Sequence, residues 1–131
     1  MKYLLDTMVW LWSVGPSDRI GRAGLEIMAS GEEEVYFSAV SSWEVAIKTK
    51  LRKFELRDVP TRYVPKRLTE QGIHSLPVTQ GHTLKVYDLP LYHNDPFDRL
   101  LIAQAVIEDM TILTSDRVFE KYPVQVVWCG K

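Results

Sequence analysis

Short apolar runs alternate along this chain with longer segments of helical spacing, and this alternation constrains the fold more than any other feature. Runs rich in β-branched and aromatic residues cover 3–5, 35–37, 111–114 and 124–128. Amphipathic patterns typical of helices cover 22–30, 40–51, 61–71, 79–87 and 96–108. Strands joined by helix-length crossovers pair in parallel, and the helices then cover both faces of the sheet. We therefore predict an α/β fold, a three-layer α/β/α sandwich with a central parallel sheet.

Length and the spacing of turns predict one domain over residues 1–131. The chain has 131 residues, of which 46% are hydrophobic, so a single core accounts for it. Glycine and proline residues favour turns near 15–16, 31, 72 and 123. The apolar segment 1–12 is interrupted by Asp6 and lacks a cleavage site, so we interpret it as a buried strand.

Localisation follows from two further features. No stretch approaches the ~20 apolar residues that cross a bilayer, so no membrane association is expected. Cys129 is the only cysteine, and it has no histidine or cysteine partner at metal-ligand spacing. A lone thiol is typical of a reducing compartment, so we expect a cytoplasmic protein.

Basic residues gather in one segment, although the formal net charge of the chain is only -1. The 48–67 segment has only two acidic residues, Glu55 and Asp58. It carries eight basic residues, Lys48, Lys50, Arg52, Lys53, Arg57, Arg62, Lys66 and Arg67. Such a segment could follow a phosphate backbone or receive an acidic protein segment. The alternative is a solvated helical face without a partner.

Four carboxylates fall where an open parallel sheet collects its ligands. Asp6 follows the first apolar run, and Asp116 follows the run 111–114. Because ligands bind beyond the carboxyl ends of parallel strands, both side chains are expected in one crevice. Glu44 and Asp98 lie in the first turns of predicted helices that begin after strand or loop segments.

Helix capping is the alternative explanation for each of these acids. Ser41 and Glu44 have the spacing of a capping box, and Asp95 is a candidate N-cap before Pro96. Capping does not explain convergence, because two carboxylates ~4 Å apart repel by ~4 kcal/mol at an effective dielectric near 20. A divalent cation removes this repulsion, and an all-oxygen donor set suits Mg²⁺, with Mn²⁺ as a substitute.

The same residues carry a family resemblance. The motifs are LLDT at 4–7, SSWE at 41–44, HNDPFDRLLIAQA at 93–105 and TSD at 114–116. Their order and spacing resemble those of VapC-type PIN-domain toxins from residue 3 to about residue 128, and the long 93–105 block is the most specific. Two positions depart from the family pattern, because Met8 stands where histidine is common and Asn94 where a basic residue is common. These departures put the substrate preference in doubt, whereas every carboxylate is present.

The resemblance implies a metal-dependent endoribonuclease, the toxin of a type II toxin-antitoxin system. It implies that Asp6, Glu44, Asp98 and Asp116 are the catalytic and metal-binding residues, with Asp6 and Asp98 as the principal Mg²⁺ ligands. The implied partners are an RNA substrate, a VapB-like antitoxin and a second copy of the chain in a homodimer. We expect the 48–67 segment and the helix before it to contact the antitoxin.

Two other functions place acids at strand ends. A non-catalytic receiver-like module needs an adjacent acidic pair after its first strand, and Asp6-Thr7 supplies only one acid. A haloacid-dehalogenase-like phosphatase needs a second aspartate two residues after the first, where this chain has Met8. Both alternatives therefore rank below the ribonuclease.

The other candidate residues have structural explanations as well as functional ones. Arg99 could contact a substrate phosphate or only balance the acids around Asp98. The three histidines are too dispersed for a metal site and are expected to be structural or exposed: His74, His82 and His93. Core packing is favoured over base stacking for three of the four tryptophans, which are Trp10, Trp12, Trp43 and Trp128.

Overall fold

A five-stranded parallel sheet forms the centre of the molecule. The computed structural model describes residues 1–15 and 18–131, so the turn expected at 15–16 lies partly outside the described residues. The strand order is β3-β2-β1-β4-β5. The strands are β1 (Lys2–Leu5), β2 (Glu34–Ser38), β3 (His74–Leu76), β4 (Thr111–Thr114) and β5 (Val126–Trp128). The predicted parallel sheet is confirmed.

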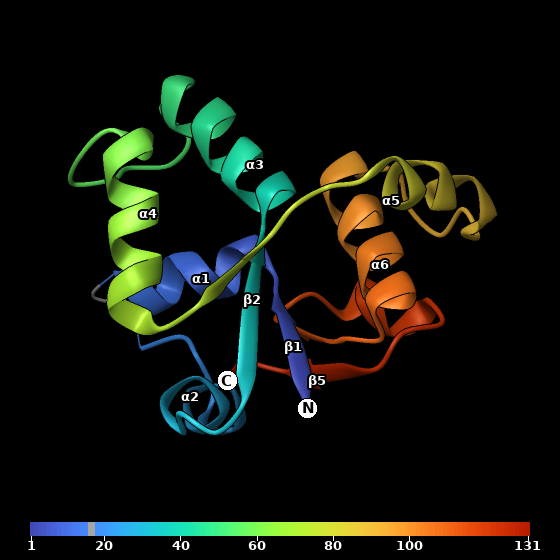
Figure 1. Ribbon diagram of the computed structural model, residues 1–131, viewed down its shortest axis with the longest axis horizontal. Coiled ribbons are helices and arrows are strands. Elements are labelled where there is room, and N and C mark those ends of the chain that lie inside the picture. The colour runs from blue at the N-terminus through green and yellow to red at the C-terminus, as the bar shows by residue number, and fades with distance from the viewer. Residues whose placement is uncertain (16–17) are drawn as a thin grey trace.

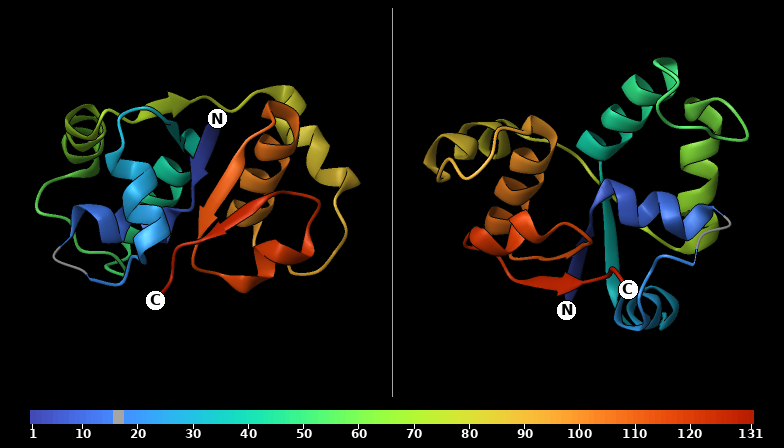
Figure 2. Two further views of the ribbon diagram at one scale, coloured as in Figure 1. Left: turned by 90° about the horizontal axis from the view of Figure 1, so that it is seen from below. Right: turned by 180° about the vertical axis from the view of Figure 1, so that it is seen from behind.

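Helices cover both faces of this sheet. They are α1 (Thr7–Val14), α2 (Arg22–Ala29), α3 (Ala39–Lys50), α4 (Pro60–Gln71), α5 (Gln80–Lys85) and α6 (Pro96–Glu108), with 3-10 turns η1 (Val86–Asp88) and η2 (Arg117–Lys121). Figure 1 shows α1, α2 and α4 on the left of the sheet and α5 and α6 on the right. Figure 2 shows the C-terminus beside α2, where Gly21 N donates to Cys129 O at 2.7 Å. The three-layer α/β/α sandwich is confirmed.

Alternation along β1 divides the core into two halves. Leu5 packs with Val9 and Trp10 of α1, whereas Leu4 packs with Leu101 and other residues of α6. Successive side chains of a strand point to opposite faces, so each strand contributes to both halves. β1 is central because it pairs with β2 on one side and with β4 on the other. Its buried position explains why 3–5 has no polar residue.

Two elements near the predicted strands were misjudged from the sequence. The segment 1–12 was expected to be a strand, but β1 ends at Leu5 and α1 begins at Thr7. Asp6 has extended backbone angles between the two, and α1 lacks a polar face because both the sheet and α4 cover it. β3 was missed because it is a three-residue edge strand with two exposed side chains.

Histidine 82 is a structural residue, as expected. Its side chain is buried, and its Nδ1 accepts a hydrogen bond from Thr79 N at 3.0 Å. Its Nε2 is 2.8 Å from Glu108 Oε2, so α5 is tied to the end of α6. Among the described residues, no helix has both the length and the hydropathy needed to cross a membrane.

Candidate metal-binding active site

Asp6 lies at the point where the sheet topology reverses. β1 connects to β2 on one side of the sheet, while β4 pairs on its other side. Such a switch point leaves a crevice beyond the carboxyl ends of the two strands. Asp6 is buried there, and Thr114 at the end of β4 donates its hydroxyl proton to Asp6 Oδ2 at 2.7 Å. Figure 1 shows α1 and α3 leaving this same end of the sheet.

Glu44 reaches the site from the first half of α3. The predicted capping box with Ser41 is wrong, because α3 begins at Ala39 and Ser38 is its N-cap, accepting from Val40 N at 3.0 Å. β2 runs directly into the helix, so Ser41 lies inside α3 and accepts from Thr7 Oγ1 at 2.8 Å. Glu44 is therefore buried beyond the capping turn, where Lys48 Nζ donates to its Oε2 at 2.5 Å.

Asp98 enters from the first turn of α6. Asp95 is the N-cap of that helix, as predicted, because its Oδ1 accepts from Phe97 N at 2.9 Å and from Asp98 N at 3.1 Å. The carboxylate of Asp98 is consequently not needed for capping. Its Oδ2 is 3.1 Å from His93 Nε2 instead.

Asp116 occupies the exposed rim of the site. Its Oδ1 accepts from Val118 N at 3.0 Å, so it caps η2, which is the alternative role considered for it from the sequence. Its carboxylate charge nevertheless acts on both Asp6 and Asp98. Capping and proximity to the other acids therefore coexist at this residue.

Burial and mutual repulsion raise the pKa of two carboxyl groups. Burial raises the pKa of Asp6 to about 6, and the charges of Glu44 and Asp116 add to this, while the hydrogen bond from Thr114 opposes it. Burial also raises the pKa of Asp98 to about 8, with further contributions from Asp6, the capping Asp95, Glu44 and Asp116. Such shifts cluster at functional sites because stability alone does not favour them. The four predicted carboxylates thus act on one another electrostatically.

A hydrogen-bonded chain leads from Arg99 to Asp98. Arg99 is buried, and its Nη1 donates to Pro90 O at 2.7 Å and to Tyr122 Oη at 3.1 Å. Tyr122 Oη lies 2.7 Å from His93 Nδ1 and accepts from Arg99, so its own proton is free to go to Nδ1. The other ring nitrogen of His93, Nε2, faces Asp98 Oδ2. Arg99 therefore binds the loop before α6. It is not placed to contact a substrate phosphate, as the sequence had suggested.

Removing the Tyr122 hydroxyl should cost stability. In Tyr122→Phe, the buried Arg99 loses an acceptor and His93 Nδ1 loses its hydrogen-bond partner, so we expect the free energy of unfolding to fall by about 1–3 kcal/mol. Urea denaturation measures this loss. Tyr92→Phe is the matched control, because Tyr92 is 52% exposed and contacts Tyr122 only edge-to-face. Equal losses of stability in the two variants would contradict the proposed hydrogen-bonded connection from Arg99 to Asp98.

The donor set fits a hard divalent cation chemically. All four groups are carboxylates, and two have raised pKa values that a bound cation would lower. Among the described residues, however, no three His, Cys, Asp or Glu side chains are grouped closely enough to hold a metal ion as they stand. Lys48 and His93 hold oxygens of Glu44 and Asp98. Side-chain adjustment would therefore have to accompany metal binding.

The partners of these two carboxylates, Lys48 and His93, were not predicted from the sequence. Lys48 follows Glu44 at the i,i+4 spacing of a helical ion pair, so the signal was present but was assigned to the basic segment. His93 lies five residues before Asp98, outside the helix, and no periodicity connects the two. Tyr122 is distant in sequence, and only the fold brings it to this site.

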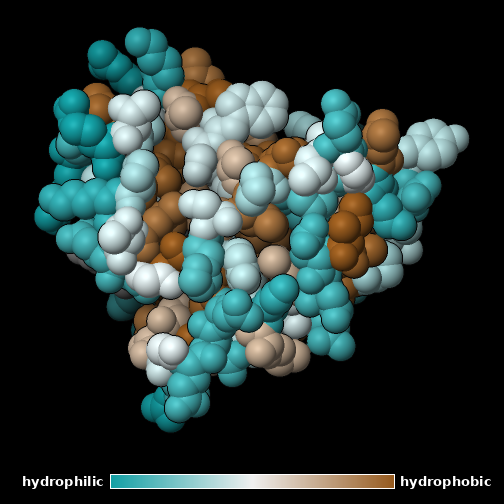
Figure 3. Space-filling view, viewed as in Figure 1, coloured by the Kyte–Doolittle hydropathy of each residue, from teal (hydrophilic) through white to brown (hydrophobic). Residues whose placement is uncertain are grey.

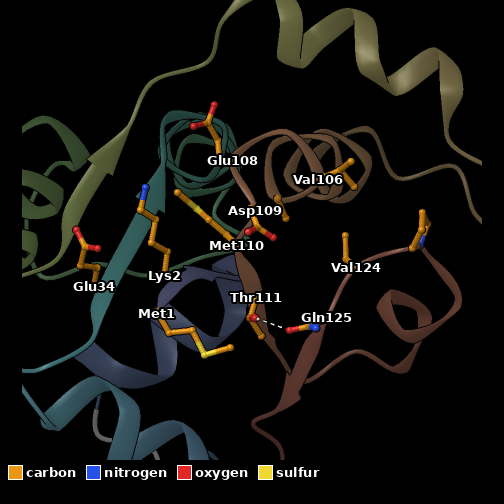
Figure 4. Close-up of a pocket in the computed structure, with 12 residues that line it drawn as sticks. Met1, Lys2, Glu34, Val106, Glu108, Asp109, Met110, Thr111, Val124 and Gln125 are labelled. Carbon is orange, nitrogen blue, oxygen red and sulfur yellow. Dashed lines mark hydrogen bonds between the residues drawn. The ribbon is translucent and has the colours of Figure 1, made fainter.

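A groove of about 700 Å³ lies at the other end of the sheet, near the starts of β1, β2 and β4. Figure 4 shows Lys2, Glu34 and Glu108 around it, with Thr111 donating to Gln125. Ligands of open α/β sheets bind beyond the carboxyl ends of strands, and the coupled acids lie there. We therefore place the candidate active site at the carboxylates and not in this groove.

A family model decides the classification. The model of the PIN domain matches residues 3–125. The chain belongs to the PIN-domain family. PIN domains are generally nucleases, so this membership places the chain in a family of hydrolases. A comparison with curated protein sequences found no significant match.

Solved structures show the same PIN fold. VapBC2 from Rickettsia felis, bound to a promoter DNA fragment, matches with a TM-score of 0.72 and 14% identity over 98% of this chain and 99% of that chain. FitAcB from Neisseria gonorrhoeae matches with a TM-score of 0.66 and 22% identity over 95% of each chain. A toxin-antitoxin complex from Klebsiella pneumoniae matches with a TM-score of 0.61 and 16% identity, again over 95% of each. At these identities the likeness establishes the fold.

Proposed function

We propose that this PIN domain, formed by residues 1–131, is a Mg²⁺-dependent endoribonuclease that acts as the toxin of a type II toxin-antitoxin system. The observation that carries the proposal is the electrostatic coupling of acids from four separate segments at the carboxyl ends of β1 and β4. Such coupling costs stability in the free protein, and a bound cation would compensate for it. The family's general nuclease activity supports the same interpretation.

The proposed roles follow from burial and contacts. Asp6 and Asp98 would be the principal Mg²⁺ ligands because they are the most perturbed acids, and Glu44 and Asp116 would complete the site directly or through water. Thr114 orients Asp6, and His93 orients Asp98. A bound divalent cation would supply the activation of water and the neutralisation of charge on the leaving oxygen. Mn²⁺ is the expected substitute because it accepts the same oxygen ligands.

The proposed partners come from the structural relatives. VapBC2 and FitAcB are similar in fold, and a VapB-like antitoxin is accordingly the proposed protein partner of this chain. We propose that the basic 48–67 segment contributes to that contact through its exposed charges, together with α3. A homodimer in the cytoplasm is the proposed state of the protein.

Cleavage of RNA by the purified chain tests the function. A mixed RNA pool is incubated with the wild-type protein and Mg²⁺, with a chelator, and with Asp98→Asn to reveal contaminating nuclease. We expect cleavage that needs both the metal and Asp98. Asp88→Asn is the matched control, because Asp88 is an exposed acid of η1 that pairs with Lys85. Its cleavage should equal that of the wild type.

One outcome would replace the proposal. If folded wild-type protein, free of antitoxin, cuts no RNA with either Mg²⁺ or Mn²⁺, a non-catalytic α/β interaction module becomes the better explanation. Circular dichroism on the same samples confirms that the chain is folded.

A further inference from the structure

Trp43 is an exposed aromatic residue beside the candidate active site. It precedes Glu44 in α3, and 58% of its surface is accessible, whereas Trp10 is fully buried and Trp12 and Trp128 are half-buried. Burial of so large an apolar side chain is favourable, so leaving it exposed costs stability. Core packing was expected for three of the four tryptophans, and Trp43 is the one in an exposed position.

The indole of Trp43 is nevertheless held in place. It packs edge-to-face against Phe97, with ring centroids 5.3 Å apart and planes at 69°. Phe97 precedes Asp98 in α6, so this contact joins the two helices that carry Glu44 and Asp98. An anchored ring loses little conformational entropy when a ligand binds. Trp43 therefore has the accessibility and the fixed position of a contact residue.

Basic side chains follow Trp43 along the chain. Lys48, which pairs with Glu44, has its Nζ 5.6 Å from the centre of the Phe97 ring. Lys50 at the end of α3 and Arg52 and Lys53 just after it are exposed. Figure 3 shows hydrophilic side chains over the end of α3 and over α4 in the orientation of Figure 1. A phosphate backbone extending from the carboxylates along α3 would be attracted by these cations.

We propose that Trp43 stacks on an unpaired nucleobase of a single-stranded nucleic acid whose phosphodiester lies at the carboxylates. This inference rests on the proposed nuclease function and assigns a substrate-binding residue to it. Bases of a single strand offer free aromatic faces, whereas those of a duplex already stack on one another. An aromatic platform beside basic residues is the arrangement that binds single strands without strict sequence preference. The chain should therefore prefer single-stranded substrates.

Binding to strands with and without bases tests the stacking. Protein carrying Asp98→Asn, which prevents cleavage, is titrated into a labelled single-stranded RNA and into a strand of equal length made of abasic sites, with Mg²⁺ present. Fluorescence anisotropy gives both dissociation constants. Adding Trp43→Ala should weaken binding of the base-bearing strand by about 10-fold or more. Abasic strands should bind weakly and with equal affinity to both proteins.

Matched variants separate stacking from folding. Trp43→Phe keeps an aromatic face and should retain binding within about 3-fold. Trp43→Leu fills space without a ring and should behave like Trp43→Ala, so a poorly folded alanine variant leaves the test intact. Tyr87→Ala removes another exposed ring, 92% accessible in η1, and should leave binding unchanged. Quenching of tryptophan emission by the RNA should be largely lost in Trp43→Phe.

Three outcomes would overturn the inference. Equal affinity of Trp43→Ala and its parent for the base-bearing RNA would exclude stacking. Equal weakening on both strands would show that Trp43 acts without recognising a base. Loss of binding to a purified antitoxin without any loss for RNA would assign the surface to a protein partner. Base-dependent binding without any cleavage by the wild type would support Trp43 while contradicting the nuclease proposal.

Discussion

Replacing Asp6 with asparagine should reduce RNA cleavage by about 10³-fold or more while leaving the fold intact. Asparagine has nearly the same shape, and its Oδ1 can still accept the hydrogen bond from Thr114. What disappears is a buried negative charge at the centre of the site. Cleavage of a labelled RNA at saturating Mg²⁺ measures the loss.

Stability data distinguish this loss from misfolding. Because burial disfavours the charged form of Asp6, removing the charge should keep the melting temperature of the metal-free protein equal or raise it. Asp116→Asn provides the comparison within the site, since Asp116 is exposed and already caps η2, so its effect on cleavage should be smaller. An Asp6→Asn protein that cleaves RNA at the wild-type rate would contradict its role as a principal ligand.

The metal-free protein should lose stability as the pH rises from about 4 to about 8. Asp98 has a pKa of about 8 in the fold and Asp6 a pKa of about 6, against an ordinary aspartate pKa of 3.8. Between those values the folded state binds protons that the unfolded state has released. Raising the pH therefore lowers the free energy of unfolding, with the full benefit present only below about pH 4. The pKa shift of Asp98 alone should lower the free energy of unfolding by an amount on the order of 5 kcal/mol across this pH range.

Thermal melting across this pH range, in the presence of a chelator, measures the effect. Asp98→Asn should remove most of the decline, because its side chain does not titrate. Asp88→Asn should leave the decline unchanged, since that acid is exposed, pairs with Lys85, and is not among the charges that raise the pKa of Asp6 or Asp98. Added Mg²⁺ should raise the melting temperature more at high pH, where the carboxylates are ionised. A wild-type profile as flat as that of Asp98→Asn would show that the acids do not interact in solution.

Much of the fold could be predicted because the interactions that determine it are local. β1 and β4 are apolar on both sides because helices cover both faces of the sheet, and that pattern is visible in four-residue runs. The helix from Pro96 carries its own start signal, with Asp95 as N-cap and proline in its first turn. The missed α1 had no such pattern, because it is buried on more than one side.

The acids of the candidate site could be proposed from the sequence, whereas their contacts could not. Asp6 and Asp116 were found because they end neighbouring strands, and the carboxyl ends of parallel strands share one edge of a sheet. Glu44 was proposed from its place near a predicted helix start and again from the family resemblance, while its supposed capping role was wrong, because the helix begins directly at the end of β2.

The alternation of strands and helices and the start of α6 follow from the amino-acid sequence alone, which also singles out the four acids as candidates. These features depend on side-chain periodicity and backbone hydrogen bonds within a few residues. The folded chain is needed to see that Tyr122 supports His93, that Arg99 turns to the loop carbonyls, and that Trp43 stays exposed. Those outcomes depend on contacts between segments far apart in the chain, and packing of the whole domain determines which side chains are buried.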